Sequence, residues 1–187
     1  MKSAVAVDLL EKMAKDGKYV YSTPDLRMLF TESERTRIGT LERLVGKGIL
    51  VRATEASGIY VYPDGRSEGS RIRHQVALML RQGHYSYISL ESSLSAYGVI
   101  DQIPAVLTVM TTGREGKFTT PWGRIEFVHT ERSPVDILTR ARRGPDGNLD
   151  IALPDMALED MKRTKRDLSL VDWEMYQEAL EELEEFL

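Results

Sequence analysis

A helix pattern that runs directly into two β-rich stretches, over residues 30 to 63, constrains the fold of this chain most. From Glu34 onward, apolar residues recur at helical spacing as far as Gly48, a residue typical of a helix stop. The stretches 49–52 and 59–62 are rich in Ile, Val and Tyr, and the loop between them ends in Ser57-Gly58. This order predicts a helix followed by a β-hairpin.

Two further helices are expected before this stretch. Residues 4–14 carry apolar residues at helical spacing, and Ser22-Thr23-Pro24-Asp25 has the hydroxyl, proline and acid that begin helices. Thr31 and Glu34 have the spacing of a capping box for the third helix. Three short helices and a hairpin predict a winged helix-turn-helix, in which the third helix enters the DNA major groove and the hairpin touches the flanking backbone.

The third helix is expected to have two chemically different faces. At 100° per residue, the apolar residues Ile38, Leu41, Leu44 and Val45 fall on one side. The other side mixes hydroxyls and cations, which bond phosphates and base edges. A glycine there costs about 1 kcal/mol relative to alanine, but it allows close approach to a groove wall. We therefore expect the DNA-contacting residues of the helix and hairpin to be Arg35, Thr36, Gly39, Thr40, Arg43, Lys47, Arg52 and Ser57.

The charge of the chain is spread unevenly. The formal net charge is −4, yet residues 1–66 hold 11 Lys and Arg against 9 Asp and Glu, whereas residues 151–187 hold 4 against 11. Net acidity does not exclude DNA binding, because the charge on the contacting face decides it. A purely structural or protein-binding winged helix stays open, since Glu34 and Glu42 reduce the cation density of the helix.

A polar stretch rich in turn residues, from Pro63 to Ser70, is the expected domain boundary. It divides the chain into a winged-helix DNA-binding domain, residues 1–66, and a C-terminal domain, residues 67–187. The second domain is expected to be mixed α/β with a small sheet and terminal helices, so the fold class is α+β. The segments expected in it are helices over 72–80 and between Ser89 and Gly98, strands over 104–110, 117–120 and 123–129, and helices over 154–166 and from a Ser169 cap to Leu187.

Two short motifs in the second domain resemble a known family. The first is Tyr87-Ile88-Ser89 followed by Ser92-Ser93-Leu94-Ser95-Ala96-Tyr97-Gly98, then Asp101-Gln102-Ile103-Pro104 and a strand. The second is Leu153-Pro154-Asp155-Met156-Ala157-Leu158-Glu159-Asp160. Their order after a winged helix is similar to that of the AbiEi-type antitoxins of bacterial type IV toxin–antitoxin systems. Glu159 departs from the pattern, where an apolar residue is expected.

The resemblance implies a two-part, non-enzymatic protein. Its winged helix would bind repeats in its own operator DNA and repress the toxin–antitoxin operon. Its C-terminal domain, residues 67–187, would counteract a nucleotidyltransferase-like toxin, without a tight complex between the two proteins. A different regulator stays open as an alternative, with no toxin partner and a second domain that senses a ligand or holds a dimer.

Catalytic interpretations find less support in the sequence. The chain has no cysteine, and His74, His84 and His129 lie too far apart for metal-ligand spacing, so neither a metal nor another cofactor is expected. No glycine-rich phosphate loop is present. Asp101 with Glu115-Gly116-Lys117 has the residue types of a nuclease metal site, which leaves a nuclease as a third alternative. The basic run 161–166 stands beside an acidic helix, and pairing with the glutamates of that helix is expected, with contact to RNA or DNA as the alternative.

The expected location is the cytoplasm. No apolar run approaches the roughly 20 residues of a membrane span, so no membrane partner is expected. The first residues contain acidic side chains and no small-residue cleavage site, which argues against a signal peptide.

Overall fold

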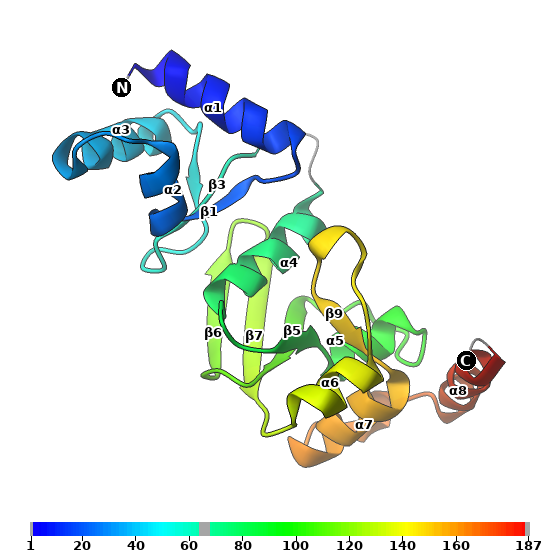
Figure 1. The fold of residues 1–187 in the computed structure, drawn as a ribbon. Helices are drawn as coiled ribbons and strands as arrows, with labels where there is room; N and C mark the ends of the chain where they lie inside the picture. The colour runs from blue at the N-terminus through cyan, green and yellow to red at the C-terminus, as the bar shows by residue number, and fades with distance from the viewer. Residues whose placement is uncertain (1, 64–67, 186–187) are drawn as a thin grey trace. The chain divides into compact units, whose positions relative to one another are not determined.

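The computed structural model describes residues 2–63 and 68–185. The chain divides into two compact units, one of residues 1–80 with 120–122 and the other of residues 81–119 with 123–187. Both units mix helices with a small sheet, which confirms the α+β class (Figure 1). Among the described residues, no helix combines the length and the apolar character needed to cross a membrane.

The first unit contains four helices and three short strands among its described residues. Its sheet has the order β1-β3-β2 and is antiparallel throughout. The elements are α1 (Ser3–Lys15), β1 (Val20–Ser22), α2 (Thr23–Leu29), α3 (Glu34–Gly46), β2 (Val51–Arg52), β3 (Ile59–Val61) and α4 (Gly69–Leu80). The predicted hairpin is confirmed, because Val51 pairs with Val61 and Arg52 with Tyr60.

Local hydrogen bonds explain where the second and third helices begin and end. Ser22 Oγ accepts from the Asp25 amide and the Asp25 carboxylate accepts from the Ser22 amide, which closes the capping box of α2. The capping box predicted at Thr31 is wrong, because α3 begins after Ser33, whose hydroxyl lies 2.8 Å from the Thr36 hydroxyl. Helix α3 ends at Gly46, and the predicted stop Gly48 follows it with a φ of +68° that favours glycine.

The boundary between the units differs from the sequence prediction. Residues 64–67 lie outside the described residues, but α4 follows them and belongs to the first unit. Helix α4 packs against β1 and β3 and buries Ile72, Val76 and Ala77. The first unit therefore extends to residue 80 rather than 66, since the amphipathic helix after the turn-rich stretch covers the N-terminal sheet.

The second unit is built on a six-stranded mixed sheet of order β6-β7-β5-β4-β9-β8. Strands β5 and β7 pair in parallel, as do β4 and β9, whereas β4–β5 and β8–β9 are antiparallel. The elements are β4 (Ser86–Ile88), α5 (Leu90–Ala96), β5 (Val106–Thr111), β6 (Gly116–Thr120), β7 (Gly123–His129), α6 (Pro134–Arg140), β8 (Ala141–Arg142), β9 (Asp150–Ala152), α7 (Pro154–Arg163) and α8 (Trp173–Glu185).

The core of this unit lies between one face of the sheet and helices α5, α7 and α8. Tyr87 and Met110 point to the same face, because they are register partners in β4 and β5. They pack with Leu94 of α5, Met161 of α7 and Tyr176 of α8 in one buried apolar cluster. The predicted strands are confirmed within one or two residues at each end, whereas β4, α6, β8 and β9 were not predicted.

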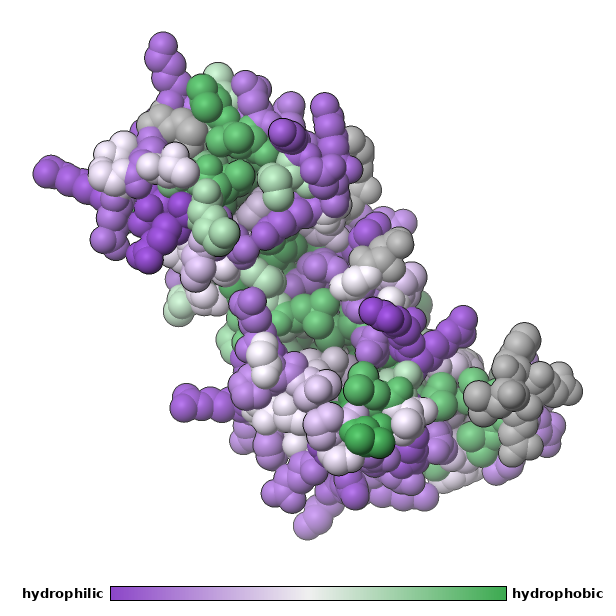
Figure 2. Space-filling view, viewed as in Figure 1, coloured by the Kyte–Doolittle hydropathy of each residue, from purple (hydrophilic) through white to green (hydrophobic). Residues whose placement is uncertain are grey.

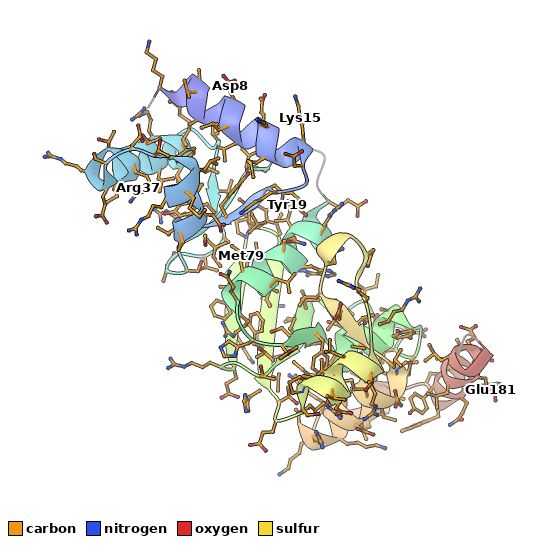
Figure 3. All side chains as sticks on the ribbon, in the orientation of Figure 1. Asp8, Lys15, Tyr19, Arg37, Met79 and Glu181 are labelled. Carbon is orange, nitrogen blue, oxygen red and sulfur yellow. The ribbon has the colours of Figure 1, made fainter. Side chains whose placement is uncertain are left out.

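The last helix begins later than predicted. Asp172, not Ser169, precedes α8, and its carboxylate accepts from the amides of Glu174 and Met175. Glu181 marks the exposed acidic side of this helix in Figure 3. The predicted end at Leu187 lies outside the described residues.

Asp160 of α7 is fully buried and accepts three side-chain hydrogen bonds. Tyr87 Oη donates at 3.0 Å and Ser89 Oγ at 2.8 Å to one carboxylate oxygen, and Arg132 Nε donates at 3.0 Å to the other. Ser89 therefore precedes α5 as predicted, but its hydroxyl bonds to α7 and does not cap its own helix. Burial and the neighbouring Asp160 carboxylate raise the pKa of Tyr87, which keeps the phenol a donor.

Arg132 extends this network toward the surface. Its guanidinium also donates to Asp136 at 2.6 Å and to Glu159 at 2.8 Å. Arg140 of α6 binds Glu159 and Asp155 from the same side. The hydrogen bonds from Arg140 and Arg132 lower the pKa of Glu159 to about 2. This explains why an acid stands in the motif where an apolar residue was expected.

Removing Asp160 is expected to destabilise the second unit strongly. In Asp160→Ala, the Arg132 guanidinium stays buried without its inner carboxylate, and such losses cost about 3–5 kcal/mol. Asp155→Ala on the same helix removes a half-exposed partner of Arg140, which costs about 1 kcal/mol or less. Urea unfolding in a Trp122→Phe background, followed by Trp173 fluorescence, measures both changes. Equal losses for the two variants would contradict the role of Asp160.

The second unit is expected to lose stability as the pH falls from 4.5 to about 2. The folded pKa of Glu159, about 2, lies below its ordinary value of 4.5, so its stabilising effect is complete above 4.5 and is lost as the pH falls toward 2. Asp136 acts in the same direction, because its hydrogen bond to Arg132 lowers its pKa. Unfolding midpoints across this window should fall less steeply in Glu159→Gln than in the wild type. Glu181→Gln serves as the exposed control and should keep the wild-type slope.

Candidate nucleic-acid interface

Helix α3 presents a polar outer face. Arg35, Thr36, Glu42, Arg43 and Lys47 are exposed, and Leu41 and Leu44 on the opposite side are buried. In Figure 2 the surface over α3 is mostly purple and pale, which marks hydrophilic and weakly polar residues. The cations and hydroxyl expected to contact DNA therefore lie on one accessible surface, with the exception of Thr40.

Thr40 is a correction to the predicted interface, because its side chain is fully buried. Its hydroxyl donates to the Glu32 carboxylate at 2.9 Å. Arg37, labelled in Figure 3, is also buried and donates to the Glu32 carbonyl oxygen at 3.3 Å. The segment before the helix thus binds two polar residues of α3, which turns Thr40 inward.

Ile38 shows the opposite deviation. It was expected to pack in the core, but 51% of its surface is exposed. With Arg37 and Thr40 on the buried side, the centre of that side shifts away from Ile38. A helical wheel weighted by hydropathy alone misses this rotation, because it treats arginine and threonine as solvent-facing residues.

Gly39 is half-buried, and no other part of the fold occupies the space that a side chain would take there. A Cβ atom built on Gly39 would meet no atom within 4 Å, and the same holds for Gly46 one heptad later. Neither glycine has the positive φ that would require glycine. Within a helix, glycine lowers stability by about 1 kcal/mol relative to alanine. Neither the backbone conformation nor a close neighbour in the fold explains why glycine stands at position 39.

The two hairpin residues of the predicted interface, Arg52 and Ser57, differ in whether their side chains can contact DNA. Arg52 is exposed on β2 but its guanidinium donates to the Tyr60 hydroxyl at 3.1 Å and lies over the Tyr60 ring. Ser57 is half-buried and uses its hydroxyl to accept from the Ile59 amide. Ser57 therefore shapes the loop, whereas Arg52 is a cation held in one position on the hairpin.

The residues of the nuclease alternative do not assemble into one site. Glu115 and Lys117 line an open pocket of the second unit, but Asp101 is not among its lining residues. Lys117 pairs with Glu126 at 3.3 Å. Over residues 2–63 and 68–185, no group of three or more His, Asp and Glu side chains has the arrangement of a metal site.

The basic run 161–166 pairs differently from the prediction. Arg166 binds Glu126 at 2.9 Å and approaches Glu91 at 3.7 Å, so its partners lie on β7 and α5 and not on the acidic helix α8. Lys162, Arg163 and Lys165 are exposed around the end of α7.

Comparison with known proteins does not assign the chain to a class. No model of a known protein family matches it, and no curated protein matches it either.

Proposed function

We propose that this chain is a DNA-binding transcriptional regulator whose first unit is a winged helix-turn-helix. The order α1-β1-α2-α3-β2-β3 and the sheet order β1-β3-β2 support this proposal. In folds of this type the third helix enters the major groove, and the hairpin between the last two strands contacts the backbone. Helix α3 and the β2–β3 hairpin supply these two parts.

The observation that carries the proposal is Gly39 of α3, where an added Cβ would meet no atom within 4 Å. A helix that lies in the major groove approaches base edges and phosphates closely, and a missing side chain shortens that approach. Arg35, Arg43 and Lys47 stand on the same exposed face and supply the positive charge that phosphates attract. Glu34 and Glu42 limit the charge, which favours selective contacts over general attraction to DNA.

The variant Gly39→Ala is expected to change stability and DNA affinity in opposite directions. Added helix propensity should stabilise the first unit by up to about 1 kcal/mol, whereas the new methyl group should weaken DNA binding. Duplexes selected from a random library by the wild type provide the probe, and gel-shift titration at several salt concentrations measures affinity.

A second variant, Lys47→Ala, tests the phosphate contact. If Lys47 binds a phosphate, the slope of the logarithm of affinity against the logarithm of salt concentration should become shallower by about one in this variant.

Gly69→Ala provides the matched control, because Gly69 is a helical glycine of α4 whose added Cβ would make only ordinary contact. It should leave DNA binding unchanged. Selection of no duplex by the wild type would contradict the proposed function, and full affinity in Gly39→Ala would contradict the role of the α3 face.

A second candidate function is antitoxin activity through the second unit. The two motifs that resemble AbiEi-type antitoxins meet in space, because Tyr87 and Ser89 of the first motif bind Asp160 of the second. The residues that the two motifs share with the antitoxins thus include those that form one buried contact. This favours a common fold over a chance similarity of sequence. We therefore propose that the second unit counteracts a nucleotidyltransferase-like toxin encoded beside this protein, without a stable complex.

Co-expression with the product of a neighbouring nucleotidyltransferase-like gene tests this second function. The full chain should restore growth without co-purifying with the toxin. Gly39→Ala should restore growth equally well, since it changes only the proposed DNA surface. Failure of the wild type to restore growth would remove the antitoxin function, and a complex that survives purification would contradict the type IV mode.

A further inference from the structure

Ile38 is an aliphatic side chain at the edge of the exposed side of α3, one helical turn from Arg35. It lies in the N-terminal half of α3, next to Gly39, and about half of its surface is exposed. The residues three or four positions away on the exposed side are Glu34, Arg35 and Glu42, all charged and exposed. Ile38 therefore has charged residues on its exposed side, whereas Leu41 and the half-buried Val45 lie on its inner side.

The folding of this unit does not account for isoleucine at this position. A β-branched residue is a weaker helix former than leucine or alanine, and an exposed one gains little from burial. A docking surface for another protein needs a contiguous apolar patch, and the charged neighbours of Ile38 on α3 interrupt such a patch. A small apolar target within a polar surface fits this arrangement better.

We propose that Ile38 reads the C5 methyl group of thymine in the major groove. Thymine presents this methyl group beside polar atoms on the groove edge, and aliphatic side chains contact it there. Gly39 carries no side chain, and a Cβ built there would meet no atom within 4 Å, so α3 can approach the groove closely at this turn. The inference rests on the proposed DNA-binding function and adds to it the base feature that α3 recognises.

A double-mutant cycle tests this contact directly. The probe is the best duplex selected by the wild-type full chain, made once with thymine and once with uracil, which lacks only the methyl group. Wild-type affinity should fall about fourfold for each methyl group that Ile38 contacts. Ile38→Ala should bind the thymine duplex more weakly than the wild type and should bind both duplexes with similar affinity. Ile38→Val, which keeps a branched aliphatic side chain, should retain part of the discrimination.

Leu138→Ala is the matched control, because Leu138 is an aliphatic residue of α6 with 59% of its surface exposed. It should keep the wild-type preference for thymine. Equal wild-type affinity for the two duplexes, or an undiminished preference in Ile38→Ala, would overturn this inference and leave DNA binding itself intact. Selection of no duplex by the wild type would remove the DNA-binding function and the inference together.

Discussion

The buried Asp160 carboxylate is the interaction on which the second unit depends. It joins α7 to strand β4 through Tyr87, to the start of α5 through Ser89, and to the segment before α6 through Arg132. A buried charge is tolerated only when its hydrogen bonds are satisfied, so these groups must hold one arrangement. The network continues toward the surface, where Arg132 and Arg140 form ion pairs with acids of α6 and α7 and hold them in place.

A smaller polar contact has a similar effect in the first unit. Glu32 accepts from Thr40 through its carboxylate and from Arg37 through its carbonyl oxygen, so two polar residues of α3 are buried. These bonds hold Arg37 and Thr40 on the inner side of α3, and Ile38 is left half exposed. The chemistry of the proposed DNA surface follows from how the helix is held on its inner side.

The distribution of charge agrees with separate roles for the two units. The exposed glutamates of α8 account for much of the acidity of the chain, and Asp136, Asp155, Glu159 and Asp160 are engaged with arginines. The overall negative charge therefore belongs largely to the second unit. It is compatible with DNA binding by the first unit because electrostatic attraction acts locally once salt screens distant charges.

The sequence by itself determined those elements whose signals are local. The hairpin, the helix start at Ser22, the glycine stops and the strand over 123–129 depend on neighbouring residues, and the structure confirms them. Only the tertiary structure decided the inward turn of Thr40, the exposure of Ile38, the position of α4 with the first unit and the bond between Ser89 and Asp160. These features depend on polar partners and packing surfaces from elsewhere in the chain, and the partner of Ser89 is 71 positions away. Hydrophobic periodicity indicates which residues can be buried. Which residues are in fact buried depends on the partners that the fold places next to them.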